Sequence, residues 1–169
     1  MKIFFGSLLV FVNLLCTSTV AKDRSNDLTI KIVEISRSGE ITVGVSNSST
    51  EPVRVWRESN SWGAAHWRVL LIREGQLRTF FQNPDQLFTK NNPAFDEIAA
   101  GAHIEKKLNP NGENWRGLDG RKIDFESGDT VIVVYDVPKE FGWPDAPVTV
   151  EARNMCVWYG VTAAFIKIQ

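Results

Sequence analysis

The sequence predicts an all-β protein: a single immunoglobulin-like antiparallel β-sandwich with long loops and at most one or two short helical turns. From Leu28 onward, apolar and polar residues alternate with a period of two, which is typical of half-buried strands. Short apolar stretches are separated by Gly, Asn, Ser and Pro, the residues that favour turns. Only residues 84–88 and 138–141 resemble helical turns, because each begins with a proline, which suits the first helical position.

The predicted strands follow one another along the chain. A hairpin joins residues 28–35 to 41–46 through a turn at Ser38 and Gly39. Residues 129–137 are apolar on both faces and are therefore predicted to form a central strand. The other predicted strands cover residues 53–56, 67–73, 77–81, 103–108, 148–150 and 157–168.

The N-terminal residues 1–21 have the pattern of a secretory signal peptide. One early lysine is followed by an apolar stretch and small residues, and the charged KDRSND comes next. A membrane-spanning helix needs about 20 apolar residues, so we expect cleavage after Ala21. A lipid-anchored cysteine usually follows a small residue. Cys16 follows the bulky Leu15, so we do not expect a lipid anchor there. Residues 22–27 are expected to form a short polar segment, and residues 28–169 a single domain. We expect the mature protein to be secreted or periplasmic, without contact with the membrane after cleavage.

The charge balance argues against a nucleic-acid partner. The chain has 19 basic and 20 acidic residues, and removal of the signal peptide takes away one lysine, Lys2. Nucleic-acid binding requires a basic face that releases counterions, and here the two signs are mixed along the sequence. The mature chain keeps one cysteine, Cys156, so no intramolecular disulfide can form. We interpret Cys156 as a small buried side chain, with an intermolecular disulfide or a reactive thiol as the alternative.

Short motifs resemble those of known exported modules. VSNSS at 45–49 and PVRV at 52–55 resemble the opening hairpin of many immunoglobulin-like modules. WRVLLIREG at 67–75 and IAAG at 98–101 continue the likeness, and the order of strands and glycine turns is similar to that of bacterial proteinase inhibitors of the BsuPI family. The resemblance spans roughly residues 28–110 and lacks the Cys…Trp…Cys spacing of antibody domains. It implies the fold more than the function.

The sequence shows no recognisable catalytic or metal-binding pattern. His66, His103 and Cys156 form no local signature of a thiol enzyme, and no Gly-x-Ser-x-Gly is present, so we expect no enzymatic activity. The two histidines and the scattered carboxylates lack the spacing of a zinc site. NPNGE at 109–113 is interpreted as a solvated turn, because it lacks the ligands of a calcium loop. No cofactor is predicted.

The candidate binding residues concentrate in WRESNSWGAAHW at 56–67, which holds three of the six tryptophans. Strand phase predicts Trp56 and Trp67 as structural side chains that pair across a hairpin, with Trp62 in the loop between them. The loops 109–122 and 141–144 also carry aromatic residues. The candidate ligand-binding residues are Trp62, Arg57, Asn60, His66, Trp115 and Arg116, and Asn47 in the sequence NSS is a candidate glycosylation site.

These features favour a non-catalytic, exported binding module that contacts a protein or glycan partner through aromatic-bearing loops. The first alternative is an inhibitor of an exported protease, acting through the loop 59–65. A second alternative is a carbohydrate-binding accessory domain, because aromatic faces suit the apolar faces of sugars. A third is a hydrolase whose site is assembled from residues far apart in the sequence.

Overall fold

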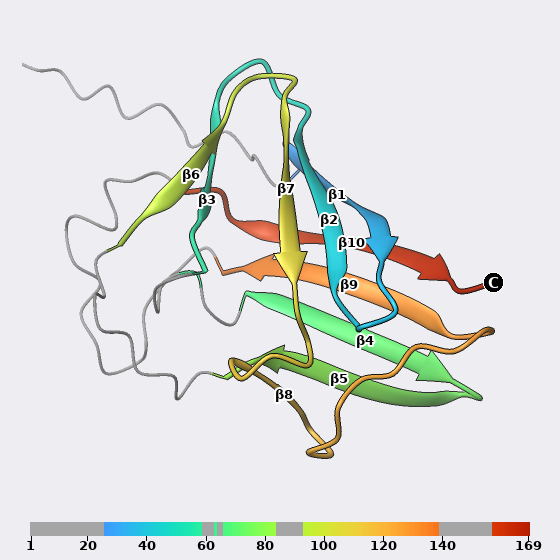
Figure 1. Cartoon of the computed structure of the whole chain (residues 1–169). Helices are drawn as coiled ribbons and strands as arrows, with labels where there is room; N and C mark the ends of the chain where they lie inside the picture. Colours follow the sequence, from blue (N-terminus) through green and yellow to red (C-terminus); the bar gives the residue numbers. More distant parts are fainter. Residues whose placement is uncertain (1–25, 59–62, 64–65, 84–92, 139–156) are drawn as a thin grey trace, which may run out of the picture.

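The computed structural model is an all-β protein, without a helix in the part of the chain that it describes (Figure 1). The structure describes residues 26–58, 63, 66–83, 93–138 and 157–169. The strands in these ranges are β1 (Leu28–Ile35), β2 (Ile41–Asn47), β3 (Val53–Trp56), β4 (Trp67–Arg73), β5 (Gln76–Gln82), β6 (Phe95–Ile98), β7 (His103–Leu108), β8 (Trp115–Gly117), β9 (Thr130–Val137) and β10 (Gly160–Lys167).

The strands form three antiparallel sheets (Figure 1). The first has the order β1-β2-β7, the second β10-β9-β4-β5-β8, and the third pairs β3 with β6. β9 lies between β10 and β4, which confirms the prediction of a central strand at residues 130–137.

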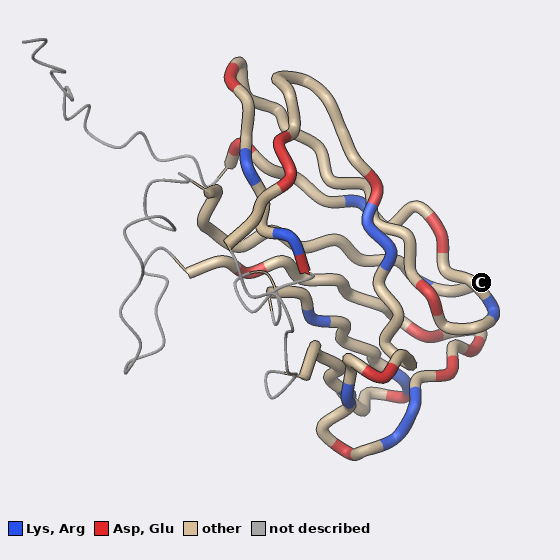
Figure 2. Tube along the Cα trace, turned by 60° about the vertical axis from the view of Figure 1, so that its left-hand side comes forward, with Lys and Arg blue, Asp and Glu red and all other residues tan. Residues whose placement is uncertain are grey.

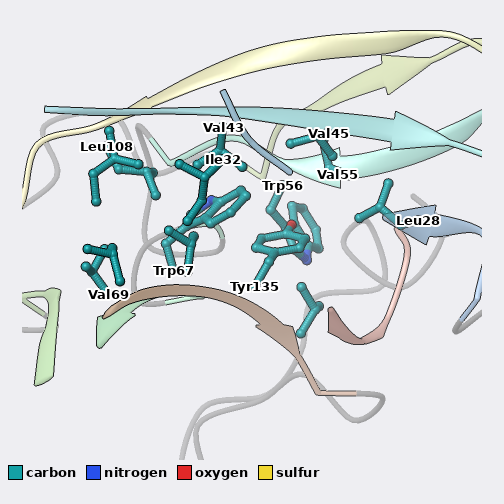
Figure 3. Close-up of a cluster of buried hydrophobic side chains, with 14 of the residues drawn as sticks. Leu28, Ile32, Val43, Val45, Val55, Trp56, Trp67, Val69, Leu108 and Tyr135 are labelled. Carbon is teal, nitrogen blue, oxygen red and sulfur yellow. The ribbon is translucent and has the colours of Figure 1, made fainter. Parts of the chain in front are cut away.

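The hydrophobic core lies between the three-stranded and the five-stranded sheet (Figure 3). Val43 and Leu108 of the first sheet point toward Val69 and Tyr135 of the second, and all four are buried. Their inward positions follow from the period of two along each strand. Fully burying a large apolar side chain contributes about 1.5–3 kcal/mol, so this shared core stabilises both sheets together.

Most of the predicted strands are confirmed, and the turn between β4 and β5 shows why the sequence specifies it. Glu74 and Gly75 both have positive φ, 49° and 76°, as the two-residue hairpin turn that matches strand twist requires. Gly75 adopts this conformation without strain, whereas Glu74 does so against its preference. The hairpin β1–β2 also turns at Ser38 and Gly39, as predicted, with Gly39 N donating to Ser36 O.

The structure corrects the predicted pairing around the tryptophan-rich stretch. β3 and β4 do not form a hairpin: Trp56 lies opposite Phe95 of β6, and Trp67 lies opposite Tyr135 of β9. The two tryptophans therefore do not pair across neighbouring strands. The connection at 57–66 is long enough to carry the chain from one sheet to another, which the local pattern of alternation does not reveal.

Two strands were not predicted. β6 is short and carries two consecutive charged residues, Asp96 and Glu97, so it lacks a clear alternation. β8 has only three residues and interrupts the segment 109–122, which was expected to form a loop. The last strand begins at Gly160 rather than at 157. The predicted strand 148–150 and the predicted helical turns at 84–88 and 138–141 lie outside the described residues, Pro138 excepted.

Figure 2 shows basic and acidic residues interspersed along the described chain, in agreement with the mixed charges of the sequence. Within those same ranges, no helix is long and apolar enough to span a bilayer.

Candidate functional site

Three long connections, at residues 57–66, 83–94 and 138–159, begin or end at one end of the five-stranded sheet (Figure 1). The register fixes this common position, because Trp67 lies opposite Tyr135 and Gly160 lies opposite Val137. We call this the loop end, defined by Trp67, Gln82, Trp115, Val137 and Gly160. The opposite end, the turn end, is defined by Arg73, Gln76, Thr130 and Lys167.

A stack of buried aromatic side chains supports the loop end (Figure 3). The ring centroids of Trp67 and Tyr135 lie 4.4 Å apart, and those of Tyr135 and Trp158 lie 5.7 Å apart with nearly parallel planes. Trp56, Trp67 and Trp158 are at most 4% exposed. The predicted structural role of Trp56 and Trp67 is therefore confirmed, although their neighbours differ from those expected. Such a stack gives the emerging loops a rigid base.

His66 anchors the start of β4 to the end of β9. Its Nδ1 lies 2.9 Å from the carbonyl oxygen of Asp136, and its own carbonyl accepts a hydrogen bond from Asp136 N at 2.9 Å. The imidazole is buried and meets the Tyr135 ring edge-on. The structure thus places this predicted binding residue beneath the loops, where it fixes the strand ends.

A charged cluster lies beside the aromatic stack, where β3 ends. Asp96 of β6 accepts hydrogen bonds at 2.7 Å from both Arg57 Nε and Lys106 Nζ of β7. Lys106 Nζ also lies 3.6 Å from Glu58 Oε1. The Arg57 side chain is 54% exposed, whereas the Lys106 side chain is 13% exposed. The predicted residue Arg57 therefore forms the surface of a cluster whose other members lie deeper.

Burial and charge shift the pKa values of the two carboxyl groups in opposite directions. Burial raises the pKa of Glu58, and the positive charge of Lys106 and the Trp67 indole N–H oppose this rise only in part. Burial also acts to raise the pKa of Asp96, but the hydrogen bonds from Lys106 and Arg57 outweigh it and place this pKa below its usual range. Lys106 therefore neutralises Asp96 more completely than Glu58.

Polar atoms from three segments are buried next to this cluster without full hydrogen bonding. Glu58 Oε1, Trp67 Nε1 and Tyr135 Oη are buried without a hydrogen bond of good geometry, although the Trp67 indole N–H acts on the Glu58 carboxyl group and the Tyr135 hydroxyl on the Trp56 backbone. Burial raises the pKa of the Tyr135 hydroxyl, so this group is protonated at neutral pH. A buried polar group without a partner destabilises the fold by about 1–3 kcal/mol. The loop end therefore combines a buried aromatic stack with buried polar groups whose hydrogen bonding is incomplete.

Trp115 and Arg116 lie on β8, at the far edge of the same sheet. Trp115 is half-buried and packs against the core, and Arg116 is exposed with its guanidinium 5.2 Å from the centre of the Phe81 ring. Consecutive strand residues point to opposite faces, so these two predicted binding residues do not form one patch. The predicted residues Trp62 and Asn60 lie outside the described residues, as do Cys156 and residues 141–144.

Asn47, the candidate glycosylation site, is buried at the end of β2, with 2% of its surface exposed. Its Nδ2 donates to the carbonyl oxygens of Glu51, Ile98 and Ala99 at 2.7–3.1 Å. Its side chain thereby joins the first sheet to the connection between β6 and β7. A glycan on this nitrogen would have to displace these hydrogen bonds.

Sequence reasoning missed Asp96, Lys106 and Tyr135. A signal was present for Lys106, because in HIEKKL it occupies the same phase as Ile104 and Leu108, which face the core. A lysine in the inward phase of a strand requires an acidic partner. Its partner Asp96 could not be found in this way, since β6 itself was not predicted.

The described ranges contain no group of three or more His, Cys, Asp or Glu side chains that could hold a metal ion. The NPNGE segment forms a turn as predicted, with Gly112 N donating to Asn109 O at 2.8 Å. Comparison of the chain with protein families, with characterised proteins and with solved structures gives no match. The functional argument therefore depends on the residues of this chain.

Proposed function

We propose that this protein is a non-catalytic, exported binding module that contacts a protein or glycan partner through its loop end. The observation that supports this proposal most is the common origin of three long connections above one buried aromatic stack. Loops on a rigid scaffold are where binding residues concentrate. The connections include Trp62, Phe88, Phe141 and Trp143, which are residue types suited to interface anchors.

The finer fold belongs to the same proposal. We infer an immunoglobulin-like β-sandwich, in which the three-stranded and five-stranded sheets pack face to face. The buried side chains that both sheets direct into one core support this inference. A crystal structure with the two strand directions about 30° apart would agree with it, and an orthogonal arrangement of the sheets would contradict it.

Export is supported by the sequence of residues 1–21. Cleavage after Ala21 gives a mature chain that begins at Lys22. Mass spectrometry of the protein from the extracellular or periplasmic fraction should show this N-terminus. A chain recovered there with residues 1–21 still attached would contradict the proposed cleavage.

One observation favours protease inhibition as the second candidate. Gly63 packs so closely against the backbone of Arg57 and Glu58 that a Cβ at this position would collide with the Arg57 carbonyl. The 57–66 connection is therefore held against the end of β3 at Gly63. A pre-organised loop loses less entropy when it binds, which suits insertion into a protease cleft.

The test compares the wild-type protein with Trp62→Ala and with a matched control, Val33→Ala, which removes an exposed apolar side chain from β1 of the three-stranded sheet. Each protein is titrated against a panel of serine, cysteine and metalloproteases and against a glycan array. We expect one class of ligand to bind, and Trp62→Ala to weaken that binding at least tenfold while Val33→Ala leaves it unchanged. Equal binding by all three proteins would contradict a contact through the 57–66 connection.

The arms of this test distinguish the candidates. Near-stoichiometric protection of a protease substrate assigns the inhibitor function, and binding to glycans without any effect on proteases assigns the carbohydrate-binding alternative. Turnover of a substrate that is lost in His66→Gln or His103→Gln would contradict the non-catalytic proposal.

A further inference from the structure

The outer face of the five-stranded sheet, turned away from the core, is unusually apolar. In most half-buried sheets this face is polar. Here four of its side chains are among the most exposed apolar ones described: Leu77 at 61%, Val161 at 65%, Leu118 at 75% and Phe165 at 78%. The apolar residues in outward phase are Leu70, Ile72, Leu77, Phe81, Leu118, Ile132, Val134, Val161, Ala163 and Phe165.

The register aligns part of this set into one row across the whole sheet. Phe165 of β10 lies opposite Ile132 of β9, which lies opposite Leu70 of β4. Leu70 lies opposite Thr79 of β5, whose carbonyl accepts a hydrogen bond from Leu118 N at 3.1 Å. The row therefore runs from Phe165 at one edge of the sheet to Leu118 at the other.

The two ends of this row have complementary shapes. Phe165 protrudes at the β10 edge, where it is 78% exposed. At the β8 edge, a hollow of about 250 Å³ is lined by Leu77, Arg78, Thr79, Leu118 and Asp119. The charges of Arg78 and Asp119 pair with each other at 2.8 Å. A cavity of about 150 Å³ accepts a benzene molecule, so this hollow has room for a phenyl ring. Two copies can stack with their outer faces together, related by a twofold axis that lies between the faces, parallel to the strands and over the middle strand. This symmetry brings Phe165 of each copy over the hollow of the other.

The charged side chains of this face are either paired within the chain or located at the edges of the sheet. Arg68 is neutralised within the chain by Asp136, at 3.4 Å. Arg116 lies on the edge strand β8 over the Phe81 ring, and Lys167 lies at the end of β10. The row from Phe165 to Leu118 contains no charged residue, so stacking it against a second copy buries no unpaired charge. An apolar centre with a charged rim is the usual anatomy of a protein interface.

The size of the face is sufficient for a dimer. β9 and β10 have eight residues each, β4 and β5 seven, and β8 three. At about 3.3 Å per residue and about 4.8 Å per strand, they cover roughly 520 Å². Two copies stacked on this face bury about 1000 Å² together, about the minimum size of a specific interface.

We propose that the protein forms a symmetric dimer through the outer face of its five-stranded sheet, with Phe165 of each copy inserted into the hollow between Leu77 and Leu118 of the other. The partner is thus a second copy of this chain. The dimer forms on the sheet face and not at the loop end, so it does not depend on the proposed function.

The test measures the oligomeric state of the purified protein by sedimentation velocity between about 1 and 200 μM. Phe165→Thr removes the protruding ring, and threonine suits the strand β10. Leu118→Trp, in the turn after β8, fills the hollow. The control is Val33→Thr, which removes another exposed apolar side chain, 53% exposed, from β1 of the other sheet.

We expect the wild type and Val33→Thr to dimerise with the same dissociation constant. Each of the other two variants should weaken dimerisation at least tenfold. In a twofold symmetric dimer, each substitution changes two contacts, one from each copy. A monomeric wild type at 200 μM, or unchanged dimerisation of both face variants, would overturn the proposal. A monomer that binds phosphatidylcholine vesicles through Phe165 would also overturn it, by assigning the face to a lipid surface.

Discussion

The two ends of the five-stranded sheet differ in how completely a carboxyl group of each is hydrogen-bonded. At the turn end, Asp129 is 1% exposed and accepts hydrogen bonds at 2.8 Å from Arg73 Nε, Arg73 Nη2 and Glu126 N. At the loop end, Glu58 Oε1 is buried 3.6 Å from Lys106 Nζ, beyond hydrogen-bond distance. The Asp129 side chain is 1% exposed and fully bonded, whereas the Glu58 side chain is 22% exposed and incompletely bonded.

The pKa values record this contrast. The hydrogen bonds from Arg73 place the pKa of Asp129 below its usual range, and those same bonds raise the pKa of Arg73. Burial, incompletely compensated by Lys106, raises the pKa of Glu58. The turn end is therefore built for stability. At the loop end, burial disfavours the ionised form of Glu58.

The largest effect is expected for Asp129→Asn at the turn end. The variant keeps the shape of the side chain but loses the charge-assisted bonds to Arg73, and hydrogen bonds to charged groups contribute about 1.5–3 kcal/mol each. We expect a decrease in the free energy of unfolding of about 3 kcal/mol, measured by urea denaturation at pH 7. A decrease below about 1 kcal/mol would remove the distinction between the two ends.

The same pair predicts how stability depends on pH. Because the pKa of Asp129 is lower in the folded state than its unfolded value of about 3.9, its contribution is fully present above that value and is lost as the pH falls through the folded pKa. The unfolding free energy of the wild type should therefore fall more steeply than that of Asp129→Asn between about pH 4 and pH 2. Parallel curves for the two proteins would contradict the role of this ion pair.

A smaller effect is expected for Asn111→Ala, also near the turn end. Asn111 Oδ1 accepts from Ile123 N at 2.7 Å, and its Nδ2 donates to the carbonyl oxygens of Ile123 and Ser38. The side chain therefore fastens the segment before β9 to the β1–β2 turn. Alanine leaves the part-buried Ile123 N–H without this acceptor, so we expect a loss of about 2 kcal/mol in the unfolding free energy. Asn109→Ala, in the same loop, is the control and should lose less.

The smallest effect is expected for Arg57→Gln at the loop end. Its ion pair with Asp96 is exposed, and Lys106 also bonds Asp96. Exposed ion pairs contribute about 0–1 kcal/mol, so the unfolding free energy should change by no more than about 0.5 kcal/mol. Thermal denaturation at low and high salt measures this directly. A loss as large as that of Asp129→Asn would show that the loop end depends on its charges for stability.

The sequence was sufficient for the strands whose alternation is regular. β1, β2, β4 and β7 begin and end within a residue or so of the predicted ranges, because one face of each is buried and the period of two marks it. β6 escaped prediction because the consecutive charged residues Asp96 and Glu97 interrupt its alternation, and β8 because three residues are too few to show a period.

The site was harder to predict than the fold, because it depends on which strands become neighbours. Local phase indicated that Trp56 and Trp67 are structural, but not that Trp67 stacks on Tyr135, which is far away in the sequence. The charged cluster unites β3, β6 and β7, three strands that no local pattern connects. The role of Trp62 as a contact residue stays a prediction.

The central claim is that the loop end holds its buried carboxyl group at the expense of stability, and the unfolding free energy of Glu58→Gln tests it most directly. Since the pKa of Glu58 is raised in the folded state, its favourable contribution is present below the unfolded value of about 4.3 and is lost as the pH rises through the folded pKa. Glutamine keeps an acceptor oxygen without the charge. At pH 7.5 the variant should therefore equal or exceed the wild type in stability, and this difference should shrink toward pH 4. A variant about 1 kcal/mol or more less stable than the wild type at pH 7.5 would contradict the claim, because it would show that ionised Glu58 stabilises the fold.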